Sequence, residues 1–144
     1  MTTNVHDHTA RHPTMIFVNL PVKDVARSGT FFSKLGYEIN QQFSTEDCAC
    51  VVISDTIYAM LLSEQRFADF TTKPVVDATR QTEAILCLSA PSREAVDTLA
   101  DNALAAGGSG SQAAEDEGYM YGHSFQDLDG HIWEVMWMDP AAVA

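Results

Sequence analysis

The feature that most constrains this chain is an internal repeat in the order of its expected strands and helices. In the first half, a strand over 15–22 leads to a helix over 25–35, and strand-like runs follow at 37–43, 48–54 and 57–62. In the second half, a strand over 83–89 leads to a second helix, followed by strands at 120–126 and 131–138. The apolar face of that second helix carries Val96, Leu99, Ala100, Ala103 and Leu104 at helical spacing. The repeat predicts an α+β fold of two βαβββ modules, whose strands form mixed sheets.

The ends of these elements carry residues that favour them. Asp24 and Ser92 are good helix N-caps, because their side-chain oxygens accept hydrogen bonds from the exposed amides of the first turn. Gly36 and the pair at 107–108 suit the residue after a helix, where φ is positive. The turn Asp127-Leu128-Asp129-Gly130 contains Asp-Gly, a strong hairpin signal, between the last two strands.

The modules are expected at about 15–72 and 83–138, within a single domain over 14–140. Residues 1–13, which carry His6, His8 and His12, show no periodicity and predict a mobile tail that would bind metal only adventitiously. The segment 64–70 predicts a helical turn that covers an opening, with Phe67 and Phe70 anchoring a loop or forming a lid. Residues 73–82 predict a connector.

The charge and the cysteine content indicate which partners the protein can bind and in which compartment it is expected. Eight basic and 20 acidic residues give a net charge of −12, which repels nucleic-acid phosphates and anionic membranes. No apolar run is long enough to span a membrane and no signal peptide is visible, so a soluble, cytoplasmic protein is expected. Cys48, Cys50 and Cys87 lack the spacing of a zinc site, and they predict reduced thiols, with Cys48 and Cys50 on one face of a strand.

Two stretches resemble the vicinal-oxygen-chelate superfamily of glyoxalases, bleomycin-resistance proteins and extradiol dioxygenases. The first runs from Val18-Asn19-Leu20-Pro21-Val22-Lys23-Asp24 to Leu35-Gly36-Tyr37 and is similar to the family's first strand and helix. The second, Phe125-Gln126-Asp127-Leu128-Asp129-Gly130-His131-Ile132-Trp133-Glu134, is similar to its closing hairpin. With the repeat, the resemblance covers about residues 15–139.

The resemblance implies a half-open cup of strands that holds a small-molecule ligand, and it implies a homodimer. In metal-using members of the family, both modules supply ligands to a divalent ion in the cup, and the ion acts as a Lewis acid. The family's ligand positions map here to Phe17, Ile85, Glu134 and Ala59, or to Met60 in place of Ala59 if the gap in the turn is moved. Only Glu134 is a ligand type, so no cofactor is expected and a divalent metal is the less favoured alternative.

The residues around Glu134 depend on the register of the last hairpin. A tight turn places Tyr121, His123 and Phe125 on the face of Glu134, whereas a turn one residue longer places Gly122 and Ser124 there. Asn19 shares the face of Phe17, and Trp133 and Trp137 point away from Glu134 into the core. His131 lies at odd spacing from Glu134, which disfavours it as a partner.

Two functions follow from the resemblance. The first is a small-molecule binding protein of the bleomycin-resistance kind, with a degenerate metal site. Its expected ligand site contains Phe17, Asn19, Ala59, Ile85, Tyr121, His123 and Glu134. The alternative is an enzyme, a divalent-metal-dependent lyase of the lactoylglutathione-lyase kind or an extradiol dioxygenase. Glu134 would then be the catalytic residue and would hold the metal, with His123 as an expected partner.

Overall fold

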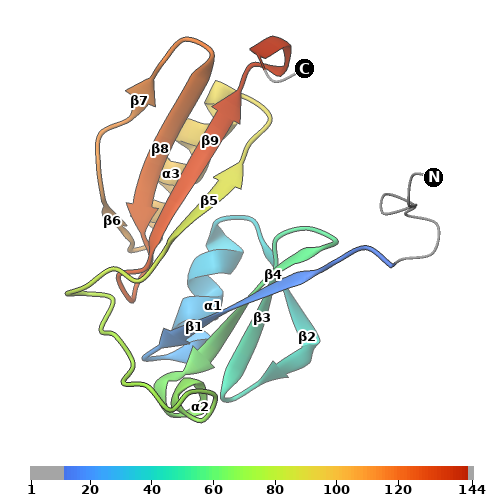
Figure 1. Cartoon of the computed structure of the whole chain (residues 1–144), viewed down its shortest axis with the longest axis vertical. Coiled ribbons are helices and arrows are strands. Elements are labelled where there is room, and N and C mark those ends of the chain that lie inside the picture. Colours follow the sequence, from blue (N-terminus) through green and yellow to red (C-terminus); the bar gives the residue numbers. More distant parts are fainter. Residues whose placement is uncertain (1–11, 143–144) are drawn as a thin grey trace, which may run out of the picture.

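The structure, a computed structural model, describes residues 12–142 and contains two repeats, each a sheet with a helix packed against it (Figure 1). The first sheet has the order β1-β4-β3-β2 and the second β5-β9-β8-β6, with β7 also paired to β8. The first module comprises β1 (Ile16–Val22), α1 (Val25–Lys34), β2 (Glu38–Thr45), β3 (Cys48–Val52), β4 (Ile57–Ser63) and α2 (Glu64–Ala68). The second comprises β5 (Ile85–Ser89), α3 (Arg93–Ala105), β6 (Ser109–Gly110), β7 (Glu115–Asp116), β8 (Met120–Gln126) and β9 (Ile132–Met138), and the 3-10 turn η2 (Pro140–Ala142) follows. The expected α+β fold of two βαβββ modules is confirmed.

The helix ends form where the sequence predicted them. The side chain of Asp24 accepts a hydrogen bond from the amide of Arg27 at 3.0 Å, and Ser92 accepts one from Ala95 at 3.0 Å. Gly36 follows α1 at φ +102° and Gly107 follows α3 at φ +106°, a conformation that costs glycine little. Interactions close in the chain therefore define the residues at which α1 and α3 begin and end.

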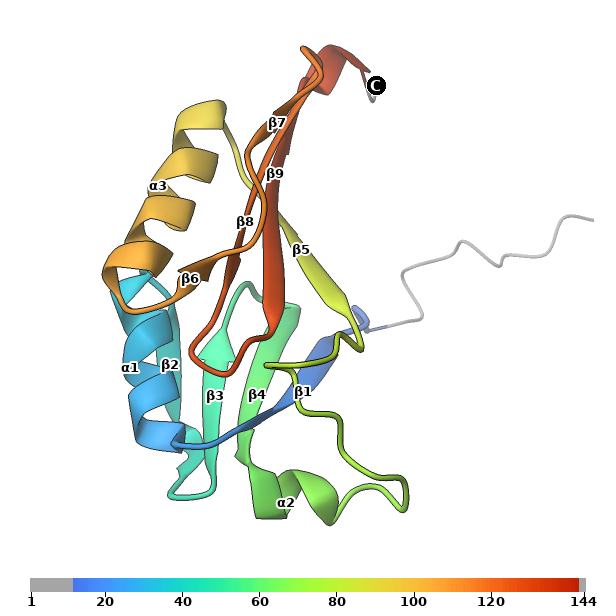
Figure 2. The ribbon, with the colours of Figure 1, turned by 90° about the vertical axis from the view of Figure 1, so that its left-hand side faces the viewer.

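Both helices cover the same side of the two sheets, and their apolar faces share one core (Figure 2). Val96, Ala100 and Ala103 of α3 are fully buried, whereas Leu104, which was expected on that face, is 45% exposed. In the first module, alternate residues point towards α1, namely Leu20 and Val22 of β1 and Ala59 and Leu61 of β4. Within residues 12–142, no helix is long and apolar enough to cross a membrane.

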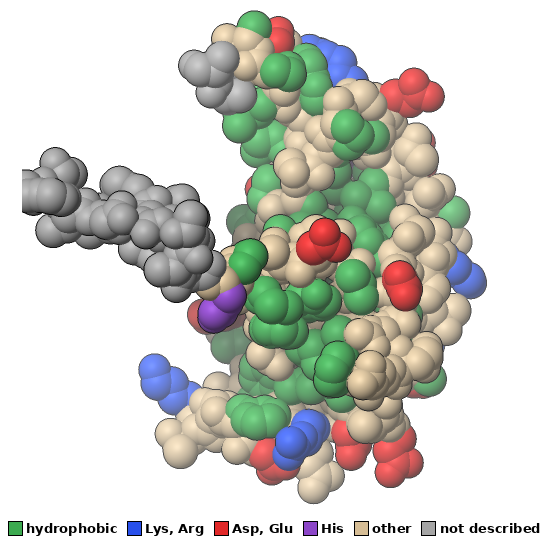
Figure 3. Space-filling view, turned by 90° about the vertical axis from the view of Figure 1, so that its right-hand side faces the viewer, with side chains coloured by type: hydrophobic (Ala, Val, Ile, Leu, Met, Phe, Trp, Pro, Cys, Tyr) green, Lys and Arg blue, Asp and Glu red, His purple; other side chains and the backbone are tan. Residues whose placement is uncertain are grey.

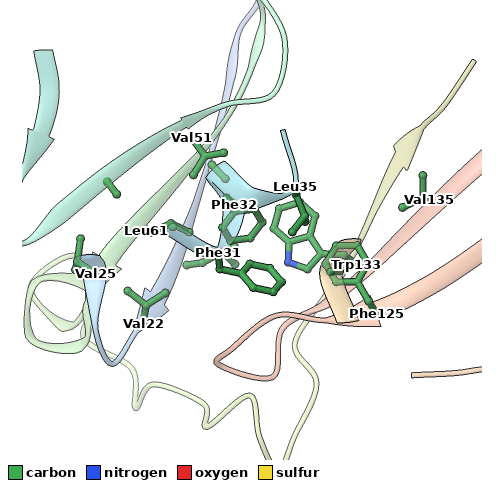
Figure 4. Close-up of a cluster of buried hydrophobic side chains, with 14 of the residues drawn as sticks. Val22, Val25, Phe31, Phe32, Leu35, Val51, Leu61, Phe125, Trp133 and Val135 are labelled. Atoms are coloured by element: carbon green, nitrogen blue, oxygen red, sulfur yellow. The ribbon is translucent and has the colours of Figure 1, made fainter. Parts of the chain in front are cut away.

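Four aromatic rings join the modules at the centre of this core (Figure 4). Phe32 of α1 meets Trp133 of β9 edge to face, with 5.3 Å between the ring centroids, and it meets Phe31 in the same way at 5.1 Å. Phe31 in turn packs against Phe125 of β8 at 6.3 Å. Burial of large aromatic side chains contributes strongly to stability, so the helix of the first module is held by the second sheet as well as by its own.

Polar contacts from the β8–β9 turn reinforce this junction. The carboxylate of Asp129 accepts hydrogen bonds from the amide of Lys23 at 2.9 Å and from the hydroxyl of Ser28 at 3.0 Å. The ring Nε2 of His131 donates to the carbonyl oxygen of Pro21 at 2.8 Å. The two motifs that carry the family resemblance, one in each module, are therefore in direct contact at the start of α1.

Candidate functional site

The candidate site is the sheet face that the helices leave open. On β1, Phe17 and Asn19 point to this face, because the alternate residues Val18, Leu20 and Val22 face the core. On β9, Glu134 points to it and is exposed, whereas Trp133 and Val135 are buried beneath the helices. The expected placement of Phe17, Asn19 and Glu134 on this face, and of Trp133 in the core, agrees with the structure. Figure 3 shows the molecule from the right-hand side of Figure 1, where hydrophobic side chains gather with acidic side chains among them.

A pocket of about 410 Å³ lies where the two modules meet, and both core-facing and open-face side chains line it. Its walls come from β1, from the start of β5 and β9, and from the connector that follows α2. The apolar lining includes Val18, Leu20, Leu86 and Ile132, together with Phe67 of α2 and Pro74, Val75 and Val76 of the connector. Asn19, Lys73, Glu83 and His131 supply polar groups. This volume and mixture suit a small ligand, because such pockets are mostly apolar with a few polar groups that fix orientation.

Aromatic and acidic groups lie on the same strand faces as the pocket residues Asn19 and Ile132. The rings of Phe17 and Tyr58 stack nearly parallel, with 4.9 Å between centroids and 11° between planes. Glu134 lies two residues beyond the pocket residue Ile132 and on the same face of β9. The thiol of Cys87 lies beside Glu134, since the two residues are register partners in the parallel pair β5–β9. Burial and the negative charge of Glu134 both raise the pKa of Cys87.

Ile85 is also on the open side of β5, where it is 55% exposed at the edge of the second sheet. It neighbours Ile132 in register, so it extends the apolar surface beside the pocket. Three of the four mapped ligand positions, Phe17, Ile85 and Glu134, therefore share the open side of the strands.

The expectation that Ala59 lines the cup is wrong. Ala59 is fully buried against α1, and its neighbour Met60 takes the open face, in register with Asn19 of β1. The alternative placement of the gap in the β3–β4 turn is the one that the fold adopts. A strand alternates faces at every residue, so an error of one position moves the side chain to the other side of the sheet.

The expectation that Tyr121 and His123 share the face of Glu134 is also wrong. The residues in register with Glu134 and Met136 are Ser124 and Gly122, so Tyr121 and His123 pair with the core-facing Trp137 and Val135. The hydroxyl of Tyr121 donates to Asp97 of α3 at 2.6 Å, and this hydrogen bond is the main cause that raises the pKa of Tyr121. The longer turn, 127–131, fixes this register. His123 is therefore on the wrong face to bind a metal together with Glu134.

The donor set at the mapped ligand positions does not fit Mg²⁺ or Zn²⁺. The mapped ligand positions hold an aromatic ring, a thioether, an aliphatic chain and one carboxylate, at Phe17, Met60, Ile85 and Glu134. Mg²⁺ and Zn²⁺ require several oxygen, nitrogen or thiolate ligands. Within residues 12–142, no group of three or more His, Cys, Asp and Glu side chains is arranged to hold a metal. The tail histidines His6 and His8 lie outside the described residues.

Sequence reasoning missed the connector as a wall of the pocket and missed Cys87 as the neighbour of Glu134. The connector has no periodicity, and its position depends on tertiary contacts such as that between Gly130, at φ +89°, and the backbone of Ala78. The signal for Cys87 was available, because Ile85 and Cys87 are two residues apart and so share a strand face.

Comparisons with known proteins agree with this architecture. The model of the bleomycin resistance protein-like N-terminal region matches residues 14–54, which include β1, α1, β2 and β3. No curated protein matches the chain. Among solved structures, a hypothetical protein from S. aureus is 25% identical, with a TM-score of 0.74, over 90% of this chain and 98% of that chain.

Two further structures carry family names. A glyoxalase/bleomycin resistance protein/dioxygenase family enzyme from Burkholderia phytofirmans is 16% identical, with a TM-score of 0.72, over 88% of this chain and 99% of that chain. The fosfomycin resistance protein FosX from Listeria monocytogenes is 16% identical, with a TM-score of 0.62, over 88% and 94% of the two chains. At these identities the likeness concerns the fold. The chain has the fold of the vicinal-oxygen-chelate superfamily, as its two sequence motifs indicated.

Proposed function

We propose that this protein binds a small cationic molecule with a planar apolar body on the open face of its sheets, without a bound divalent metal. The observation that carries this proposal is a largely apolar pocket of about 410 Å³ that is lined in part by the carboxylate of Glu83. A second carboxylate, Glu134, lies two residues beyond the pocket residue Ile132 on the same face of β9. The stacked rings of Phe17 and Tyr58 offer a surface for a planar group. A net charge of −12 attracts cations to the molecule as a whole.

The alternative of a metal-dependent lyase or dioxygenase is less well supported by the residues. Such chemistry needs an ion with several fixed ligands and open positions for substrate. Only Glu134, of the four mapped positions, offers an oxygen. The names of the similar structures include both resistance proteins and enzymes, and the donor set favours the binding role.

Replacing Glu134 by glutamine tests the proposed cation site. We expect the mutant to bind the planar cation 9-aminoacridine roughly tenfold more weakly, because it loses a charge-assisted contact. Binding of acridine, which has the same rings but is neutral at pH 7, is expected to change little. Fluorescence titration of the purified protein measures both affinities.

The matched control is Glu94→Gln, which removes the same charge from α3 on the helix side. It is expected to leave both affinities unchanged. Equal losses in Glu134→Gln and Glu94→Gln would show a general charge effect and contradict the site. Failure of the parent protein to bind either dye would contradict the planar apolar ligand class.

We further propose that the protein is a cytoplasmic homodimer in which edge strand β1 of one protomer lies beside β5 of its partner. Each of these strands has one sheet neighbour among the described residues, so each has a free edge. Ile16, Phe17 and Ile85 expose between 49% and 55% of their surface there, and exposed apolar edges favour association. The three free cysteines suit a reducing compartment.

A charge placed on the edge strand tests the dimer. Ile16→Lys is expected to shift the protein from dimer to monomer in sedimentation velocity, because burying an ammonium group at the interface costs several kcal/mol. The control Leu104→Lys changes an exposed apolar residue of α3 and is expected to leave the dimer intact. A parent protein that sediments as a monomer at micromolar concentration would refute the proposed assembly.

A further inference from the structure

The open face of the first sheet carries three sulfur-containing side chains in one group. Cys48 and Cys50 of β3 point away from α1, because the residues that alternate with them, Ala49 and Val51, pack in the core. Met60 of β4 is the register partner of Cys50 in the antiparallel pair β3–β4. Side chains that face each other across neighbouring strands have Cβ atoms about 5 Å apart. The three sulfur atoms therefore share one face of two adjacent strands.

The spacing of the two thiols suits a metal bridge along the strand. Residues two apart on a strand have Cα atoms about 6.7 Å apart, and their side chains point the same way. Two metal–sulfur bonds of about 2.3 Å in line span roughly 4.6 Å. Each cysteine side chain needs to lean by only about 1 Å towards the other to reach a shared ion.

The surroundings of this group are partly closed and carry a positive charge. Cys50 is 2% exposed, whereas Cys48 and Met60 are half-buried and so remain accessible. The short helix α2 packs against β1 and β4, and its Arg66 is close enough to Cys48 to act on the charge of that thiol. A guanidinium at this position offsets the net negative charge that two thiolates and a monovalent cation would create.

We propose that Cys48, Cys50 and Met60 form a binding site for a soft monovalent metal ion, with Cu(I) as the cation it fits. Thiolate and thioether sulfurs are the ligands that select Cu(I), in contrast to the oxygen ligands of Mg²⁺ or Mn²⁺. Binding of Cu(I) forms two copper–thiolate bonds and releases two thiol protons to solvent, and Met60 adds a neutral third ligand. This site is separate from the proposed cation site at Glu134 and does not depend on it.

The site is tested by transfer of Cu(I) from bathocuproine disulfonate to the reduced full-length protein without oxygen. We expect one equivalent to transfer, with loss of the visible absorbance of the chelator complex. Cys48→Ser is expected to weaken binding at least tenfold. Met60→Leu, which conserves volume and so keeps the fold, is expected to weaken it by a smaller factor.

The controls separate this site from other copper ligands. Cys87→Ser changes the exposed thiol of the second module, and a variant with His6, His8 and His12 replaced by alanine changes the N-terminal histidines. Both are expected to bind Cu(I) as the parent does. Failure of transfer to the parent, or equal weakening in Cys87→Ser and Cys48→Ser, would overturn the proposal. If Cys48→Ser loses Cu(I) binding but binds 9-aminoacridine as the parent does, the metal site and the proposed ligand site are independent.

Discussion

Replacing Asp127 by alanine is expected to lower the free energy of unfolding by about 3–5 kcal/mol, since it leaves several buried donors without a partner. Asp127 is 5% exposed. One of its carboxylate oxygens accepts hydrogen bonds from the amides of Asp129 and His131, both at 3.0 Å. The other accepts one from the indole Nε1–H of Trp133, also at 3.0 Å. Urea denaturation followed by tryptophan fluorescence measures the loss.

The large expected loss also reflects the contacts that the turn 127–131 makes with the first module. The hydrogen bonds to Asp127 shape the turn 127–131, and that turn presents Asp129 and His131 to the first module. Burial raises the pKa of Asp127, while the charge of His131 and the three donors oppose this rise. The carboxylate is therefore costly to bury and also hard to replace, as is typical of buried polar networks that are fully satisfied.

Two further variants sharpen this test. Asp127→Asn keeps an oxygen for the two amides but turns an NH₂ group towards the indole N–H, so we expect a smaller loss of about 1–2 kcal/mol. Asp55→Ala changes the exposed aspartate in the β3–β4 turn of the first module, where a loss within about 0.5 kcal/mol is expected. A loss below about 1 kcal/mol for Asp127→Ala would mean that water replaces the carboxylate and that the turn is not built on it.

The second large effect is expected at the aromatic junction between the modules. Phe32→Ala should cost about 3–5 kcal/mol, because it removes a buried ring and leaves a cavity that the neighbouring rings fill only in part. Phe32 is 2% exposed, and it contacts Phe31 of its own helix and Trp133 of the other module edge to face. The loss is measured by urea denaturation, followed by circular dichroism.

Controls distinguish the junction from a general effect of removing a ring. Phe43→Ala makes the same chemical change at a side chain that is 60% exposed, and its expected effect is within about 0.5 kcal/mol. Phe32→Leu keeps most of the volume and is expected to cost about 1 kcal/mol. Because Phe32 bridges the modules, a single cooperative transition is expected for every variant. Two separate transitions, with only the first module destabilised, would contradict a shared core.

Local signals in the sequence predicted the order of the strands and helices and, for most of them, which residues face the core. The local signals were the alternation of apolar residues along the strands, the N-caps at Asp24 and Ser92, and the glycines after the helices. Each of them depends on interactions between residues close in the chain. The same local logic placed Phe17 and Asn19 together and set Glu134 opposite Trp133. The repeat and the two motifs then predicted the fold, because the arrangement of a βαβββ module follows from its element order.

The residues that surround Glu134 depend on contacts between segments that are distant in the sequence. The register of β8 against β9 depends on how many residues the turn uses, and that number is set by the buried side chain of Asp127 and by the docking of Asp129 onto Lys23 and Ser28. A change of one residue in a turn moves a whole strand to the other face. Tyr121 and His123 were therefore misplaced.

Contacts between distant segments also explain why Ala59 was expected on the wrong face and why the connector was not expected to line the pocket. Met60 instead of Ala59 points to the open face, because the antiparallel pairing with β3 and the parallel pairing with β1 together set the register of β4. The connector over 73–82 lies across the junction because residues distant in sequence hold it there. Local preferences along a chain determine which elements form, whereas contacts between distant segments determine which side chains of those elements meet.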